Sequence, residues 1–141
     1  MTISGILAPV PPDNLEIVRK FYDSWAHSEL PGPRELLDPK VEYVNPPGAI
    51  EPGIRRGIEA FNHAVESVFD GWESWQMEPE RLTQVGDQVA VVVRYRARGR
   101  TSGVEVEGRE SALFTLRDGK LVRYEWFHGP DDAHHAAKRE E

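Results

Sequence analysis

The stretch ALFTLRDGKLVRYEWFHG, residues 112–129, decides the fold class of this chain. Successive side chains of a strand face opposite sides, and apolar residues alternate on both sides of the Asp-Gly turn in this stretch. The same period of two runs back to residue 73, interrupted by VGD and GRTSG. We therefore expect an antiparallel meander of four strands, near 73–84, 88–99, 104–117 and 120–128.

The first half of the chain has a period close to 3.6, which indicates helices. Asp13 and Glu16 have capping-box spacing at the start of the first helix, which we expect to end near 27–29. A helical turn, a strand and a loop are expected at 34–37, 40–44 and 45–53. Gly57 opens a second long helix that ends at Asp70, with an apolar stripe of Ile58, Phe61, Ala64, Val65, Val68 and Phe69. Helices followed by a meander predict an α+β domain with the helices on one face of a curved sheet.

The length of 141 residues fits a single domain. We expect it at 13–130, between a flexible arm at 1–12 and a polar tail or short polar helix at 131–141. The chain has 17 Lys and Arg against 24 Asp and Glu, a net charge of −7, which argues against nucleic acid or an anionic membrane as partner. There is no cysteine, no apolar run of the ~20 residues that a membrane helix needs, and no convincing signal peptide. A cytoplasmic location is expected.

Four segments carry a resemblance to a known family across nearly the whole chain: IVRKFYDSWAHSE at 17–29, LLDPKVEYVNPPG at 36–48, PGIRRGIEAF at 52–61 and ALFTLRDGKLVRYEWF at 112–127. In their order and spacing the chain resembles the nuclear transport factor 2-like superfamily, and within it the SnoaL-like, ketosteroid isomerase-like domains. The resemblance implies a cystatin-like α+β barrel, in which a cone-shaped curved antiparallel sheet wraps around helices. It also implies an apolar pocket between helices and sheet, and a homodimer formed through the sheet.

The acids and donors that some members of this family use are missing here. The ketosteroid isomerase pattern would place a base at Asn45, a tyrosine at Phe21 and a protonated acid at Ala112. Asparagine cannot shuttle a proton, and neither phenylalanine nor alanine can donate a hydrogen bond to an enolate. The acid of the cyclase pattern falls on Trp126. The Arg-x-Asp arrangement of the epoxide hydrolases is absent from RYRAR at 94–98. The resemblance therefore supplies a pocket without supplying a reaction.

Strand parity supplies a different set of catalytic candidates. It places Glu110 among apolar residues on one face of its strand, and Tyr124, Trp126 and His128 on the corresponding face of the last strand. Burial would raise the pKa of Glu110, and a nearby imidazole could lower it again. We expect Glu110 and His128 to act as proton handlers and Tyr124 as a further donor. In the alternative, Glu110 pairs with an arginine or a tyrosine hydroxyl and only fixes the shape of the pocket.

The expected ligand-binding residues are mostly large apolar side chains from the two long helices and from the strands, for which core packing is the competing interpretation. They are Tyr22, Trp25, Asn45, Phe61, Val91, Tyr95, Ala112 and Trp126. No histidine cluster has metal-ligand spacing, and we expect His63 on a solvated helix face. Arginines and glutamates mixed on the opposite sheet face suggest cross-strand ion pairs or a polar dimer interface.

Two classes of function fit these features. In the first, the chain is a cofactor-independent isomerase, cyclase or dehydratase that acts by acid-base chemistry on a small hydrophobic or polycyclic substrate. In the second, it is a non-catalytic protein that binds such a ligand. In both, the partner is a small hydrophobic molecule, and no cofactor or metal is expected.

Overall fold

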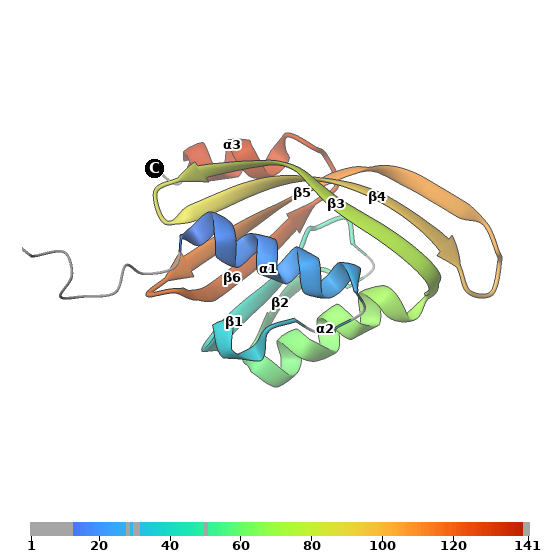
Figure 1. The fold of residues 1–141 in the computed structure, drawn as a ribbon, viewed down its shortest axis with the longest axis horizontal. Coiled ribbons are helices and arrows are strands. Elements are labelled where there is room, and N and C mark those ends of the chain that lie inside the picture. Colours follow the sequence, from blue (N-terminus) through green and yellow to red (C-terminus); the bar gives the residue numbers. More distant parts are fainter. Residues whose placement is uncertain (1–12, 28, 30–31, 50, 140–141) are drawn as a thin grey trace, which may run out of the picture.

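Six strands form one curved sheet in the order β2-β1-β6-β5-β4-β3 (Figure 1). The computed structural model describes residues 13–27, 29, 32–49 and 51–139, so the arm expected at 1–12 lies outside the described residues. The elements are α1 (Asn14–Ala26), the 3-10 helix η2 (Arg34–Leu36), β1 (Leu37–Asn45), β2 (Gly53–Arg56), α2 (Ile58–Asp70), β3 (Trp72–Val85), β4 (Gln88–Gly99), β5 (Glu105–Arg117), β6 (Lys120–Phe127) and α3 (Asp132–Arg139). No described helix is long and apolar enough to cross a membrane.

The expected fold is confirmed, and the sheet is curved but unclosed. Strands β3 to β6 form the antiparallel meander that the period of two predicts. Two features were not predicted. Strand β2 is a four-residue strand that pairs with β1, and β1 runs parallel to β6, with Tyr43 opposite Tyr124. The segment GIRR of β2 is too short and too polar to show an alternating pattern.

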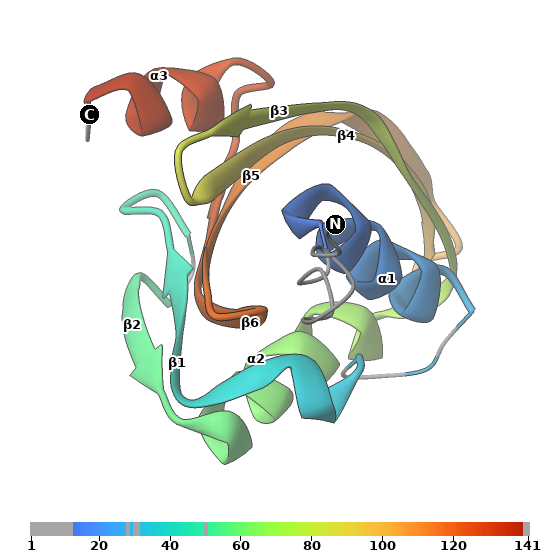
Figure 2. The ribbon, with the colours of Figure 1, turned by 60° about the vertical axis from the view of Figure 1, so that its left-hand side comes forward.

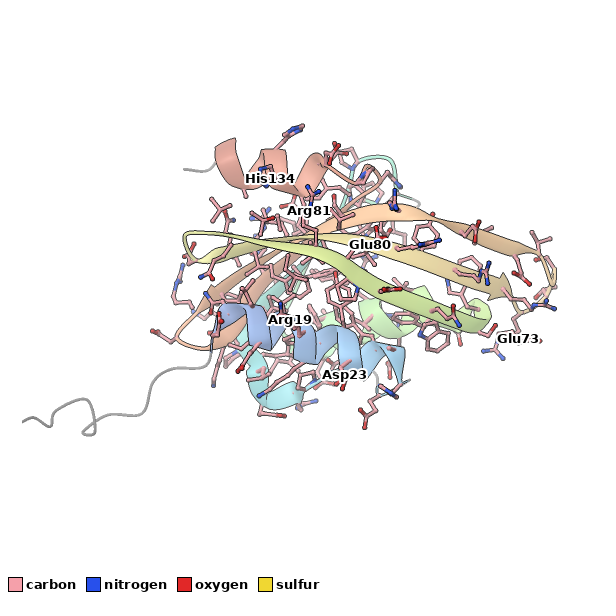
Figure 3. The ribbon with its side chains drawn as sticks, turned by 45° about the horizontal axis from the view of Figure 1, so that its top comes forward. Arg19, Asp23, Glu73, Glu80, Arg81 and His134 are labelled. Carbon is pink, nitrogen blue, oxygen red and sulfur yellow. The ribbon has the colours of Figure 1, made fainter. Side chains whose placement is uncertain are left out.

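The concave side of the sheet curls around α1, and α2 lies below it (Figure 2). The Asp13 side chain caps α1 by accepting a hydrogen bond from the backbone N–H of Leu15 at 3.0 Å. The buried face of α1 includes Phe21 and Tyr22, while Arg19 and Asp23 are exposed (Figure 3). Full burial of one large apolar side chain contributes about 1.5–3 kcal/mol to the free energy of unfolding. The buried side chains of this face therefore hold α1 against the sheet.

A β-bulge in β6 changes the parity of the last hairpin. Thr115 pairs with Arg123, but the next residue, Leu116, pairs with Leu121. Val122, which unbroken alternation would place on the same face as Tyr124, is therefore the bulged residue, and Leu121 is buried in the core instead. Beyond the bulge the predicted parity holds through Trp126, which lies opposite Ala112.

The segment after residue 130 forms α3, which packs on the convex side of the sheet beyond β4 and β5 (Figure 2). Its buried residues Ala133, Ala136 and Ala137 form a second small core with Ala90 and Leu113. The Ser111 hydroxyl donates to the Gly129 carbonyl at 2.6 Å and accepts from the Ala133 N–H at 3.1 Å. Alanines at i, i+3 and i+4 form a narrow apolar stripe along α3, and this stripe packs against the convex face of the sheet.

Candidate functional site

Two adjoining cavities lie between α2 and the concave side of the sheet. The inner pocket has a volume of about 100 Å³ and is lined by Trp25, Tyr43, Val65, Val68, Phe69, Met77, Glu110, Tyr124 and Trp126. The outer hollow has a volume of about 510 Å³ and is lined by Tyr43, Asn45, Gly48, Ala49, Glu51, Arg55, His63, Ala64, Ser67, Val68, Trp126 and His128. Tyr43, Val68 and Trp126 line both, so the outer hollow lies directly beside the inner pocket.

Glu110 lies where the apolar core ends and the inner pocket begins. Phe114, Ala112 and Glu110 alternate along the concave face of β5, as the parity argument predicts. Phe114 and Ala112 are 0% and 1% exposed, whereas Glu110 is half-buried at the wall of the pocket. Glu110 is the only carboxylate among the described residues that line the inner pocket.

The environment of Glu110 favours its neutral form. Burial raises the pKa of this carboxyl from 4.5 to about 7. Within the described part of the chain the carboxyl has no hydrogen-bond or ion-pair partner, so the alternative in which an arginine or tyrosine fixes it is not observed. A group with a pKa near neutrality is populated in both protonation states at neutral pH, as an acid-base catalyst requires.

Three buried tyrosines surround the inner end of the site. Tyr43 and Tyr124 line the inner pocket with Glu110, and their ring centroids lie 5.2 Å apart. Tyr22 lies deeper, and its buried hydroxyl has no hydrogen-bond partner among the described residues. Burial is the main cause that raises the pKa of all three phenols, and the negative charge of Glu110 raises it further. These hydroxyls therefore remain protonated and can act as donors at neutral pH.

Asn45 and Trp126, the two positions at which the family resemblance would place an acid, are hydrogen-bonded to each other. The indole Nε1 of Trp126 donates to Oδ1 of Asn45 at 2.6 Å, and Nδ2 of Asn45 donates to the Glu51 carbonyl at 2.8 Å. The chain of bonds joins β6 to β1 and to the loop that precedes β2. Both residues thus hold the wall between the two cavities in place.

His128 lies in the outer hollow, not beside Glu110 in the inner pocket. Its side chain is exposed, and its ring stands edge-on to Trp126 with centroids 4.9 Å apart. The expected Glu110–His128 couple is therefore not gathered in one cavity. His63, expected on a solvated helix face, is exposed but lines the same outer hollow.

The other sequence-based candidates divide between cavity walls and core. Trp25 and Tyr124 line the inner pocket, Asn45 lines the outer hollow, and Trp126 lines both. The buried residues of the core behind the pocket are Tyr22, Phe61, Val91 and Ala112. Tyr95 lies over Gly108 on β5, where a Cβ would come within 2.9 Å of its hydroxyl, and lines neither cavity.

Five residues of the inner wall are not among the candidates expected from the sequence: Tyr43, Val65, Val68, Phe69 and Met77. Val68 belongs to the apolar stripe that the sequence predicts for this helix, and in the structure it is nevertheless 44% exposed. An apolar side chain that faces a cavity accounts for both properties. Among the described residues no group of three His, Cys, Asp or Glu side chains could hold a metal ion.

Comparisons with known proteins agree with this architecture. The family model of the SnoaL-like domain matches residues 18–124. A candidate SnoaL-like polyketide cyclase from Jannaschia sp. CCS1 is 23% identical, with a TM-score of 0.70 over 85% of this chain and 88% of its own. A hypothetical protein with a ketosteroid isomerase-like fold from Catenulispora acidiphila DSM 44928, in complex with trimethylamine, is 15% identical, with a TM-score of 0.71 over 92% and 95% of the two chains.

A cystatin-like protein from Xanthomonas campestris is 17% identical, with a TM-score of 0.69 over 89% of this chain and 98% of its own. No protein of curated function matches the chain closely enough to count as a relative. At these identities the likeness to solved structures concerns the fold and leaves the reaction to the residues of the site.

Proposed function

This chain belongs to the family of SnoaL-like domains, and we propose that it is a cofactor-independent enzyme that moves a proton on a small hydrophobic, ring-containing substrate. The reaction class is isomerisation, cyclisation or dehydration. One observation carries the proposal: an unpaired carboxyl with a pKa of about 7 lines an apolar pocket in the described part of the chain. A buried, unpaired carboxyl lowers the stability of the fold, groups of this kind cluster at functional sites, and acid-base catalysis is the function that it suits.

Glu110 acts as base and then as acid in this proposal. Its carboxylate oxygen takes a proton from the carbon next to a substrate carbonyl, and the electron pair of that C–H bond moves into an enolate. Tyr43 or Tyr124 donates a hydrogen bond to the enolate oxygen. Glu110 then returns the proton to another atom of the substrate, so no proton is lost or gained over the cycle.

The sizes of the two cavities narrow the expected substrate. The inner pocket, at about 100 Å³, is smaller than the apolar cavity of about 150 Å³ known to hold benzene. It suits the end of one ring, not a polycyclic body. The remainder of a larger substrate would lie in the outer hollow, whose volume of about 510 Å³ is typical of ligand sites.

Enolisation of a simple ketone tests the proposal without the natural substrate. We would follow α-proton exchange of 2-tetralone in D₂O by NMR, and conversion of 3-cyclohexenone to 2-cyclohexenone by absorbance. We expect Glu110→Gln to lower either rate about 10²- to 10⁴-fold, the usual contribution of a general acid-base group. Glu107→Gln, on the same strand but ion-paired with Arg96 on the other face, serves as the control and should keep the wild-type rate.

The alternative is a non-catalytic protein that binds a small hydrophobic ligand. The residues at Asn45, Phe21 and Ala112 remove the ketosteroid isomerase mechanism and favour neither alternative outright. The non-catalytic alternative predicts that the wild type binds 2-tetralone but accelerates neither reaction. Equal rates for wild type and Glu110→Gln would also contradict the role of Glu110.

We also propose that the chain forms the homodimer that the family resemblance implies. The convex face of β4 and β5 carries exposed ion pairs and is the polar surface available for such contact. A monomeric mass by light scattering at micromolar concentration would contradict this proposal.

A further inference from the structure

The outer hollow differs from the inner pocket in the charge that its wall can carry. Three nitrogen-bearing side chains capable of positive charge line it: Arg55 from β2, His63 from α2 and His128 just after β6. The inner pocket has no lysine, arginine or histidine among its described lining residues, and its one carboxyl is Glu110. The two cavities therefore favour opposite ends of a ligand.

Arg55 is the strongest donor in the outer hollow. Its guanidinium donates from Nη2 to Oε2 of Glu51 at 2.9 Å, and this is its one ion pair among the described residues. The Arg55 side chain is 28% exposed, whereas the Glu51 side chain is 76% exposed. Because a guanidinium has five N–H donors, a ligand that enters the hollow can bond to Arg55 while Glu51 stays on the solvent side.

His63 and His128 offer two further donors from other elements. Neither ring has a hydrogen bond to another residue in the described part of the chain, and both side chains are exposed to the hollow. The edge-on contact with Trp126 orients the His128 ring. The Nε2 atom of His128 lies 3.4 Å from where a Cβ on Gly48 would be, so the glycine leaves space beside this nitrogen.

We propose that the outer hollow is a carboxylate-binding subsite, and that the ligand is a small aromatic or alicyclic carboxylic acid whose carboxylate lies beside Arg55. The ring enters the inner pocket, and this part of the inference rests on the proposed function. The reverse orientation would bring a second carboxylate next to Glu110 in an apolar environment, where like charges repel strongly. The charge pattern thus sets which end of the substrate reaches Glu110.

Isothermal titration calorimetry with matched ligands tests the subsite. We would compare 3-phenylpropanoate with the neutral 3-phenylpropanamide at pH 7. A charge-assisted hydrogen bond at a half-exposed site gives about a tenfold difference in Kd, so we expect the carboxylate to bind about tenfold more tightly. Arg55→Gln should remove that difference, and Arg55→Lys should keep part of it.

Arg56→Gln is the matched control, since Arg56 is the next residue of β2, is exposed and pairs with Glu42 at 2.7 Å outside the hollow. It should leave the tenfold preference unchanged. Equal affinity for acid and amide in the wild type, equal loss in the Arg55 and Arg56 variants, or no binding of either compound would overturn the subsite.

Glu110→Gln separates this inference from the proposed function. The preference for the carboxylate should persist in that variant even though proton transfer is lost. If the preference persists but Glu110→Gln leaves enolisation intact, the subsite stands and the catalytic proposal fails. If enolisation depends on Glu110 but the wild type binds acid and amide equally, the catalytic proposal stands and the subsite fails.

Discussion

Glu107 and Glu110 lie three residues apart on β5, and their environments are opposite. Glu107 is on the convex face, where its Oε2 atom lies 3.2 Å from Nη2 of Arg96 and both side chains are mostly exposed. Glu110 is on the concave face, half-buried, without a partner among the described residues and with a pKa raised to about 7. Strand parity alone decides which of two identical side chains is an ordinary surface charge and which is a candidate catalyst.

The charged side chains of the convex face are exposed to solvent and form cross-strand ion pairs. Arg96 lies opposite Glu107 and Arg98 opposite Glu105 in the ladder between β4 and β5, and each pair forms an ion pair. The cross-strand ion pairs expected from the mixed signs are thus confirmed on this face. No such neighbour is available on the concave face at Glu110, because its cross-strand partner is Val93.

The largest effect on stability that separates the two glutamates is expected in its pH dependence. The folded-state pKa of Glu110 is raised above the unfolded value, so the folded state binds more protons between about pH 4.5 and 7. Its contribution to the free energy of unfolding is therefore fully present below pH 4.5 and is lost as the pH rises through 7. Each pKa unit corresponds to about 1.36 kcal/mol, which gives a total of about 3 kcal/mol between 4.5 and about 7.

Urea unfolding of wild type and Glu110→Gln from pH 4 to 8 measures this effect. The stability of Glu110→Gln relative to wild type should increase across the window, because glutamine has no charge to bury. Glu107→Gln should show no such increase. If the difference in the free energy of unfolding between wild type and Glu110→Gln is the same at every pH in the window, folding does not raise the pKa of Glu110.

A smaller effect is expected from breaking the ion pair on the convex face. Exposed ion pairs contribute about 0–1 kcal/mol, so Glu107→Gln and Arg96→Gln should each lower the free energy of unfolding by less than about 1 kcal/mol. The double-mutant cycle at low salt gives the coupling energy, which should shrink at 1 M NaCl. A coupling above about 2 kcal/mol would show that this face is not solvated and would favour its burial in an interface.

The sequence places Glu110 on the pocket face of β5, where the structure has it, because β5 is regular from Glu105 to Thr115 and alternation carries through without interruption. Alternation does not place His128 beside Glu110, because β6 ends at Phe127 and parity has no meaning beyond the last residue of a strand. Extending the ladder by one pair would have set His128 opposite Glu110. Instead the chain turns at Gly129, whose carbonyl accepts the Ser111 hydroxyl hydrogen bond.

The outer hollow was beyond sequence reasoning for a different reason. Arg55 belongs to β2, which is too short to show a pattern, and Asn45 and Trp126 are 81 residues apart in the chain. Their hydrogen bond depends on the parallel pairing of β1 with β6, and local periodicity carries no information about which strands become neighbours. The helices and the meander, by contrast, follow from periods that are local to each segment.

The most direct measurement is the titration of Glu110 itself. Side-chain carboxyl ¹³C NMR of the protein, with Glu110 assigned by its absence in Glu110→Gln, follows this one group from pH 3 to 9. We expect a midpoint near pH 7, within about one unit. A midpoint near the ordinary value of 4.5 would show that the Glu110 carboxyl is not desolvated, and would contradict its role as the acid-base group of the pocket.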